Sequence, residues 1–299
     1  MELIKGSSVA ALISKKITET IEKNGMKAPH LAIIRVGERA DDISYENGAC
    51  KRMDKVGIRH SIYVMDENVT SELFLNTFDK VNEDPDVDGI LLLRPLPSHL
   101  NDINIENRID PEKDVDGISP INMAHIYAGT GKGFAPCTAE AVMKIFEYSG
   151  IQVTGKKAVV VGRSLVIGKP LSMLLMRENA TVTICHSKTQ NLEKICQSGD
   201  ILVAAAGQPR MIQHDFVGEG AIVIDVGIHV EEDGRMCGDV DLESIASVAS
   251  QATPVPGGVG AVTTSVLAEH VLKAAMKKQE LEISQREIKI GKKRIEKNV

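Results

Sequence analysis

Short apolar runs that end in glycine recur along this chain of 299 residues, and they constrain its fold more than any other feature. Strands of this kind are predicted at 30–37, 156–162, 200–207 and 221–227 (HLAIIRVG, KKAVVVG, DILVAAAG and AIVIDVG). Segments between such runs carry apolar residues at helical spacing, and no hairpin signal joins neighbouring strands. This alternation predicts an α/β fold with parallel sheets.

The alternation occurs in two series. The first predicts helices at 7–24, 43–56 and 70–82 with strands at 30–37, 60–65 and 87–97, and the second predicts strands at 156–162, 180–185, 200–207 and 221–227 with helices at 138–149, 169–178 and 263–278. Residues 101–133 between them are poor in periodicity, which is typical of a functional or inter-domain segment. We expect one domain of residues 1–119 with the C-terminal helix 268–299, and a second, Rossmann-type domain of residues 120–267. The basic tail 277–299 favours a further helix and a solvated terminus about equally.

Composition excludes several classes of protein. The formal net charge of −6 leaves no basic excess for phosphate neutralisation, and the absence of Trp disfavours an aromatic platform for single strands. No run reaches the roughly 18 apolar residues of a membrane span, and the N-terminus does not read as a signal peptide. The cysteines are odd in number and no two are spaced C-x-x-C, so neither a disulfide framework nor a structural zinc is expected (Cys50, Cys137, Cys185, Cys196 and Cys237). We expect a cytoplasmic protein with no nucleic-acid, membrane or metal partner.

The segment AVVVGRSLVIGKP (158–170) combines a strand, a glycine turn and a helix start. Its glycines, Gly162 and Gly168, with Ser164 between them, differ from the usual G-x-G-x-x-G spacing. The context nevertheless fits a dinucleotide site, because amides at the start of a helix can hold a pyrophosphate. An ordinary turn between strand and helix remains the alternative.

The next strand indicates which nicotinamide cofactor binds. An acid at its end would accept a hydrogen bond from the ribose 2′-hydroxyl of NAD and repel the 2′-phosphate of NADP. The chain has Ser187 and Lys188 there, without an acid, and Arg163 adds a cation from the first turn. We therefore predict NADP, although Lys188 taken alone could be a solvated loop residue.

Two further features are candidate binding elements. The turn PVPGGVGAVT (254–263) places three glycines in four positions, which suggests a close approach of backbone to a ligand at Pro256, Gly257 and Gly258; a plain flexible loop is the alternative. Asp116 precedes Gly117, and a capping or turn aspartate is the common role of that residue pair.

These segments together resemble the methylenetetrahydrofolate dehydrogenase/cyclohydrolase family over nearly the whole chain. The matching pieces are Tyr45 on the helix predicted at 43–56, VDGILLLRPLP, KDVDG (113–117), PCT (136–138), VVVGRSLVIGKP, TVTICHSKT, GDILVAAAG, VIDVGI, GDVD (238–241) and TPVPGGVGAVT. The resemblance implies two α/β domains around a cleft and a homodimer. It also implies a multifunctional enzyme of one-carbon metabolism, which oxidises 5,10-methylenetetrahydrofolate with NADP and then hydrolyses the methenyl product to the 10-formyl compound.

Site residues follow from the same resemblance. It implies NADP contacts from Gly162, Arg163, Ser164, Ser187 and Ile228. Folate would lie in the cleft beside Tyr45 and Asp116, the two residues expected to act in catalysis, and Asp116 would then hold the donor/acceptor edge of the pterin.

The chain departs from the family at catalytic positions. The family has a lysine four residues after its tyrosine and a glutamine at the end of its third strand, where this chain has Ala49 and Leu93. Lys51 lies about 200° around a regular helix from Ala49 and cannot simply replace the lysine. Arg94 should point to the face of the strand opposite Leu93.

Three interpretations follow. The leading one is an NADP-dependent methylenetetrahydrofolate dehydrogenase whose cyclohydrolase step is weak or absent. The second is a degraded paralogue that binds folate or NADP as a non-catalytic sensor or partner subunit. The third is an enzyme of the same fold with another imine or one-carbon substrate, because three alanines also replace family residues, two of them beside the expected substrate cleft (Ala139, Ala141 and Ala261).

Overall fold

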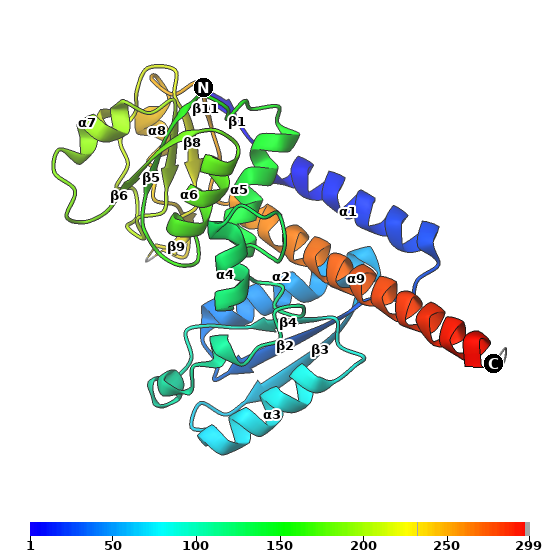
Figure 1. The fold of residues 1–299 in the computed structure, drawn as a ribbon. Coiled ribbons are helices and arrows are strands. Elements are labelled where there is room, and N and C mark those ends of the chain that lie inside the picture. The colour runs from blue at the N-terminus through cyan, green and yellow to red at the C-terminus, as the bar shows by residue number, and fades with distance from the viewer. Residues whose placement is uncertain (232, 297–299) are drawn as a thin grey trace. The chain divides into compact units, whose positions relative to one another are not determined.

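The computed structural model describes residues 1–231 and 233–296, and its contacts divide the chain into two units (Figure 1). Unit 1 contains residues 1–16 and 116–267, and unit 2 contains residues 17–115 and those from 268 onward. The boundaries differ from the expected domains chiefly at the N-terminus. Residues 1–16 group with unit 1 because β1 (Glu2–Leu3) pairs with β11 (Gln251–Ala252).

Unit 1 is built on a six-stranded sheet in the order β1-β11-β8-β7-β5-β6, and every neighbouring pair is parallel. Its longer strands are β5 (Lys157–Val161), β6 (Thr181–Cys185), β7 (Ile201–Ala204) and β8 (Ile222–Asp225). Central β5 and β7 are apolar runs buried on both faces, as parallel strands between helices should be, whereas β6 at the edge is largely exposed. The prediction of a parallel α/β sheet is confirmed.

Among the residues that the structure describes, five helices lie entirely within this unit: α4 (Pro120–Tyr127), α5 (Cys137–Tyr148), α6 (Gly168–Arg177), α7 (Leu192–Gln197) and α8 (Leu242–Ile245). Helix α4 lies inside the segment that lacked periodicity. It begins at a Ser119 cap, whose hydroxyl accepts from the amide of Asn122 at 3.2 Å, followed by a proline in the first turn. A short antiparallel pair, β9 (His229–Val230) with β10 (Met236–Cys237), was also not predicted.

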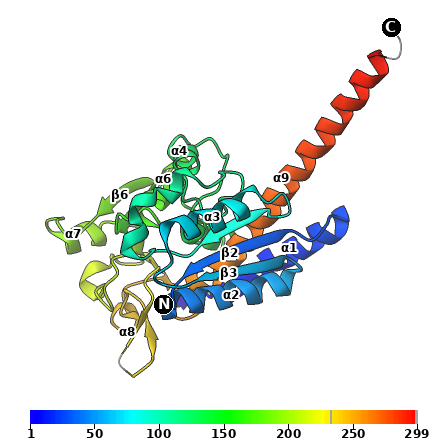
Figure 2. The ribbon, with the colours of Figure 1, turned by 90° about the horizontal axis from the view of Figure 1, so that it is seen from below.

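Unit 2 has a three-stranded parallel sheet in the order β3-β2-β4, formed by β2 (His30–Val36), β3 (Arg59–Met65) and β4 (Gly89–Leu92). Helices α2 (Ala40–Val56) and α3 (Ser71–Glu83) lie on opposite faces of it (Figures 1 and 2). Central β2 is buried along its whole length. Two 3₁₀ turns follow β4, at Ser98–Ile103 and Ile105–Asn107.

Helices α1 (Gly6–Asn24) and α9 (Val259–Glu296) each contain a boundary between the units. Helix α9 begins before the predicted 263 and continues without a break through most of the basic tail, so the helical alternative holds as far as Glu296. None of the helices that the structure describes is both long and apolar enough to cross a membrane.

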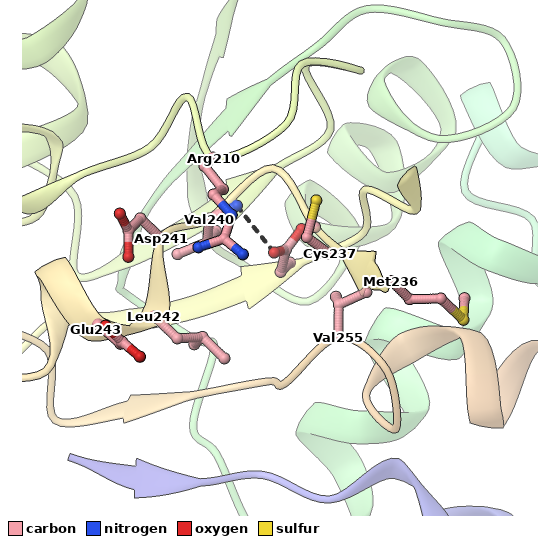
Figure 3. Close-up of a pocket in the computed structure, with 10 residues that line it drawn as sticks. Arg210, Met236, Cys237, Val240, Asp241, Leu242, Glu243 and Val255 are labelled. Carbon is pink, nitrogen blue, oxygen red and sulfur yellow. Dashed lines mark hydrogen bonds between the residues drawn. The ribbon is translucent and has the colours of Figure 1, made fainter. Parts of the chain in front are cut away.

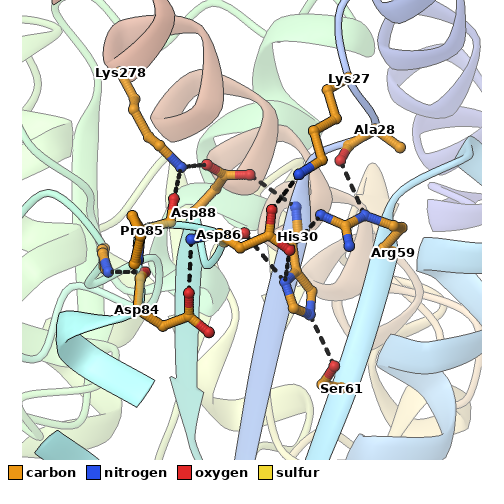
Figure 4. A network of polar contacts seen from close by, with 11 residues as sticks. Lys27, Ala28, His30, Arg59, Ser61, Asp84, Pro85, Asp86, Asp88 and Lys278 are labelled. Carbon is orange, nitrogen blue, oxygen red and sulfur yellow. Dashed lines mark hydrogen bonds and ion pairs between the residues drawn. The ribbon is translucent and has the colours of Figure 1, made fainter. Parts of the chain in front are cut away.

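A polar network closes the amino ends of the unit 2 strands (Figure 4). The imidazole of His30 lies 2.8 Å from the hydroxyl of Ser61 through Nε2 and 3.1 Å from the backbone carbonyl of Asp86 through Nδ1. Because a carbonyl can only accept, Nδ1 donates to Asp86, and the serine hydroxyl can serve as either partner of Nε2. Lys278 of α9 donates to the carboxylate of Asp88 at 2.7 Å, and Asp88 also accepts from the amide of His30 at 2.9 Å. This network ties α9 to the sheet of its unit.

Candidate functional site

The turn after β5 is folded so tightly that its glycines cannot be replaced without movement. Gly162 has φ +134°, and a Cβ there would lie 2.2 Å from the carbonyl oxygen of Ala205. A Cβ on Gly168 would lie 2.2 Å from the carbonyl oxygen of Gly162. The hydroxyl of Ser164 accepts from the amide of Ile167 at 3.2 Å. The turn is therefore a fixed structure at the carboxyl end of a central strand.

The same turn leads directly into the start of a helix. Helix α6 begins at Gly168 after an Ile167 that supplies no side-chain cap, and Arg163 and Ser164 are exposed. The helix dipole favours negative charge at this end, although the amides of Lys169 and Leu171 already donate to the carbonyls of Ser164 and Ile167 and Pro170 has no N–H. This arrangement fits a phosphate group.

The turn after β6 begins next to the turn after β5. Val161 is the register partner of Cys185, and the amide of Gly162 donates to the Cys185 carbonyl at 2.9 Å. Beyond Cys185 the side chains of Ser187 and Lys188 are exposed. The fold thus brings the turn that carries Arg163 next to the turn that carries Ser187 and Lys188, and neither turn contains an acid.

Two buried aspartates brace the turns at the same edge of the sheet. The carboxylate of Asp239 accepts from the amides of Ala206, Gly207 and Gln208 at 2.6–3.0 Å, and its Oδ1 lies 2.7 Å from Nε2 of His229. The carboxylate of Asp225, at the end of β8, accepts from the amides of Gly227, Asp239 and Val240 at 2.9–3.0 Å. Burial raises the pKa of Asp225 to about 6, although the three amides that it accepts from lower it.

These aspartates account for the neighbouring glycines. A Cβ at Gly238 would lie 1.9 Å from a carboxylate oxygen of Asp225, and one at Gly227 would lie 2.4 Å from a carboxylate oxygen of Asp239. Sequence reasoning assigned no role to either aspartate. The available signal was the pairing of each acid with a glycine in IDVG and GDVD.

Ile228 and the PGGVG turn also belong to unit 1. Ile228 is 56% exposed, and its Cδ1 would lie 3.3 Å from a Cβ at Gly260. Pro256 and Gly257 are exposed, whereas Gly258 is buried and has its Cβ position only 2.4 Å from the carbonyl oxygen of Pro254. The Gly257 carbonyl accepts from the amide of Gly6 at 2.9 Å, so this turn is held in place rather than flexible.

A separate cavity of about 160 Å³ lies next to Asp225 in unit 1 (Figure 3). The amide of Arg210 donates to the Gly238 carbonyl at 3.0 Å, and the Arg210 guanidinium pairs with Glu231 at 3.1 Å. None of the residues predicted to bind NADP lines this cavity. Within residues 1–231 and 233–296, no three His, Cys, Asp or Glu side chains gather as a metal site requires.

Asp116 lies at the start of the long unit 1 segment. Its Oδ1 accepts from the amide of Cys137, the first residue of α5, at 3.2 Å. Gly117 beside it has φ +64°, and a Cβ there would lie 2.5 Å from the Phe134 carbonyl oxygen. This contact is that of a capping aspartate; a contact with a pterin stays a prediction.

In unit 2, the buried side of α2 includes Ala49, which is fully buried, whereas Lys51 and Lys55 are exposed. Leu93 is 5% exposed, and its amide donates to the carbonyl of Ile34 at 2.9 Å, which extends the β4 ladder by one residue. Neither exposed lysine faces the side of α2 that carries Ala49.

A buried ion pair lies beside these two positions. The Nε of Arg35 donates to a carboxylate oxygen of Glu46 at 2.8 Å, and the two side chains are 10% and 9% exposed. Sequence reasoning missed both residues. The signal was an arginine inside the otherwise apolar run HLAIIRVG and a glutamate next to Tyr45.

Comparison with known proteins decides the family. Residues 4–116 match the model of the tetrahydrofolate dehydrogenase/cyclohydrolase catalytic domain, and residues 136–279 match that of the NAD(P)-binding domain. The chain belongs to this family.

Relatives of the family match along almost the whole chain. The bifunctional protein FolD of Clostridioides difficile (strain 630) is 49% identical over 276 residues, which are 91% of this chain and 96% of the relative. The crystal structure of the bifunctional enzyme FolD-methylenetetrahydrofolate dehydrogenase/cyclohydrolase from Campylobacter jejuni has a TM-score of 0.89 at 37% identity and covers 93% of this chain and 99% of its own. The Trypanosoma brucei enzyme, complexed with NADP cofactor and inhibitor, has a TM-score of 0.86 at 34% identity over 92% and 97% of the two chains.

Family membership bears on the two units differently. The turns of unit 1 keep the residues that the family resemblance assigned to NADP. In unit 2, Tyr45 is present, but Ala49 and Leu93 are apolar and buried where the resemblance placed a lysine and a glutamine. The predicted fold and family are confirmed, while the individual roles of the site residues stay predictions.

Proposed function

We propose that the protein is an NADP-dependent dehydrogenase of 5,10-methylenetetrahydrofolate and that its methenyltetrahydrofolate cyclohydrolase step is impaired. The observation that carries the proposal is the contrast between the two units of this chain. The glycine turn of unit 1 is intact and braced, whereas unit 2 has buried, non-titratable side chains at Ala49 and Leu93.

The nucleotide turns fit NADP. The positive dipole end at the start of α6 suits a pyrophosphate, and the cations of Arg163 and Lys188 on adjacent turns suit a 2′-phosphate. When bound, the cofactor supplies a nicotinamide ring that accepts a hydride. The chain has to hold this ring and the one-carbon bridge in a reactive orientation, and such positioning can supply several kcal/mol of the barrier. Oxidation of the bridge therefore does not require the missing lysine.

Hydrolysis of the methenyl product makes a different demand. Water must add to the cationic carbon while a proton is moved, and a positioned acid or base contributes roughly 10²- to 10⁴-fold to such a step. The side chains of Ala49 and Leu93 have no titratable or hydrogen-bonding atom. The exposed Lys51 and Lys55 lie on other sides of α2, and the guanidinium of Arg94 pairs with Glu106 at 3.8 Å.

The test is NADPH formation by the purified protein with 5,10-methylenetetrahydrofolate, beside a parallel assay with NAD. We expect turnover with NADP. Absence of turnover with both cofactors would contradict the proposal and favour the second candidate, a non-catalytic folate- or NADP-binding paralogue, which the joint change at Ala49 and Leu93 supports. Shifts of melting temperature with NADP, tetrahydrofolate and both together then show which ligands the protein binds.

The homodimer and the placement of folate beside Tyr45 and Asp116 are part of the proposal by family resemblance. Sedimentation equilibrium checks the first. Tetrahydrofolate binding by Tyr45→Ala and Asp116→Asn variants checks the second, and unchanged affinity in both would contradict it.

A further inference from the structure

The sheet of unit 2 has a natural ligand position between β2 and β4. The chain runs from β2 to β3 on one side and returns to β4 on the other, so the connections diverge at the β2–β4 boundary. In open α/β sheets, ligands bind at the carboxyl ends of the strands at such a switch point. Ile34 pairs in register with Leu92, and the next residues along the two strands are therefore Arg35 and Leu93.

The guanidinium of Arg35 lies at this carboxyl end and is only partly engaged. Its Nε donates to Glu46, and its Nη1 donates to the carbonyl of Gly37, the residue after β2. Within the part of the chain that the structure describes, Nη2 has no hydrogen-bond partner. A guanidinium has five N–H donors, so a rigidly held side chain retains donors for a further acceptor.

Other charged and apolar residues on the buried side of α2 surround the pair of Arg35 and Glu46. Glu46 lies one turn before Ala49 and one turn after Asp42, and all three are buried. Burial raises the pKa of Asp42, and the positive charges of Arg39 and Arg35 oppose that rise. The groups that face Arg35 are thus two acids from α2, while Ala49 and Leu93 offer no polar atom.

Stability gives no reason for this arrangement. Two buried charges lose hydration that their attraction only partly repays, and an apolar pair of similar volume is often as stable. The pair fixes one guanidinium in one orientation at the switch point, which is what recognition of a ligand oxygen requires.

We propose that Arg35 donates a hydrogen bond to a carbonyl oxygen of the folate-type ligand, and that Glu46 is the positioning residue that holds the guanidinium for this contact. The inference rests on the proposed function, whose site it makes more specific. Two sources share this chemistry: a formyl oxygen on the one-carbon group and the ring carbonyl of the pteridine.

The experiment compares ligand affinity in the full-length protein by titration calorimetry, with 5-formyltetrahydrofolate, tetrahydrofolate and NADP as the three probes. The variants are Arg35→Met/Glu46→Met, which removes both charges together, and Arg35→Lys, which keeps the charge but not the planar fork. Arg108→Met is the matched control, because Arg108 forms an exposed ion pair with Asp79 at 2.5 Å on another part of unit 2.

We expect the double variant to bind 5-formyltetrahydrofolate at least about 10-fold more weakly, with NADP affinity and melting temperature little changed. Loss for 5-formyltetrahydrofolate alone identifies the formyl oxygen, and equal loss for tetrahydrofolate identifies the ring carbonyl. The control variant should match the unaltered protein with all three probes. If the double variant does not fold, Arg35→Lys decides by the same measurement, with an expected loss of about 5-fold or more.

A kinetic readout separates binding from a purely structural role. Loss of a contact made equally in the ground and transition states raises KM for methylenetetrahydrofolate and leaves kcat nearly unchanged. Folate affinity and KM within twofold of the unaltered protein would overturn the inference while leaving the proposed function intact. An unaltered protein that binds NADP but neither folate would instead overturn the proposed function, and this inference with it.

Discussion

The backbone amide of Asp239 donates a 3.0 Å hydrogen bond to the carboxylate of Asp225, and this contact links the two acids that brace the turns after β7 and β8. Each carboxylate accepts from three backbone amides. The amides surround each carboxylate as they would surround a bound anion, but here the anion is a side chain of the protein itself. The geometry of the turns after β7 and β8, at the edge where we expect the nucleotide, therefore depends on Asp225 and Asp239, which need not touch the nucleotide.

Replacing Asp239 by Asn should destabilise unit 1. The side-chain NH₂ group of asparagine would face backbone N–H donors that now donate to a carboxylate oxygen. The free energy of unfolding should therefore fall by about 2–4 kcal/mol. Urea unfolding measures the change, and NADP affinity should fall with it. The exposed Asp233, replaced in the same way, is the control. A stability loss for Asp239→Asn no larger than that of the control would contradict this account.

The raised pKa of Asp225 predicts a specific dependence of stability on pH. The unfolded residue loses its proton near its ordinary value of 3.8, and the folded one near 6. Between these values the folded state binds more protons, so the contribution is fully present below pH 4 and is lost as the pH rises to 6. The unfolding free energy of the unaltered protein minus that of Asp225→Asn should fall by about 3 kcal/mol across this window. A flat difference curve would show that the three amides keep the carboxylate ionised.

Arg163→Ala should weaken NADP binding much more than NAD binding. The exposed side chain of Arg163 lies on the turn next to the one that carries Ser187 and Lys188. Of the two cofactors, only NADP has a 2′-phosphate to accept hydrogen bonds there. A charge-assisted contact of this kind predicts roughly a 10- to 100-fold loss for NADP and little change for NAD. Titration calorimetry with each cofactor measures both, and Lys169→Ala, also exposed near the same turn, is the control. Equal losses for NADP and NAD would place the 2′-phosphate elsewhere.

The double variant Ala49→Lys, Leu93→Gln should gain cyclohydrolase activity. The unaltered protein should accelerate decay of methenyltetrahydrofolate absorbance at neutral pH only weakly, and the variant about 10-fold or more above it. Both sites are buried, so overpacking should cost about 1–3 kcal/mol of stability, which thermal unfolding would detect. The single variants are the controls, because neither restores the pair. An unaltered protein that already hydrolyses as fast as it dehydrogenates would refute this interpretation of the two replacements.

Sequence reasoning predicted those elements whose signal is local. Strands such as β5 and β8 are continuous β-branched runs between turns, and their positions agree with prediction to within one or two residues. Helix α4 was missed although Ser119 and Pro120 gave a local start signal, because it is short and its apolar spacing is weak. The two-residue strands β1 and β11 carry no local signal, since they exist only by pairing across the chain.

The candidate site divides in the same way. Gly162 and Gly168 were singled out because a strand runs through them into a helix start, and the steric reason for them is local. The pairing of Arg35 with Glu46 was not predicted, because a strand residue and a helix residue meet only after α2 has packed on the sheet. The exposed orientation of Lys51 followed from helical period, and the burial of Leu93 followed from the continuous apolar run of the strand predicted at 87–97.

The pairing of Glu2–Leu3 with Gln251–Ala252 has a consequence for biosynthesis. A ribosome adds about 5–20 residues per second, so residues 2 and 3 wait roughly 12–50 seconds for their partners to be made. Completion of unit 2 is delayed as well, because the lysine that donates to Asp88 is residue 278. The sheet of unit 1 therefore gains its edge strand β1 only after residue 252 has been made, and the contact of Asp88 with α9 forms only after residue 278.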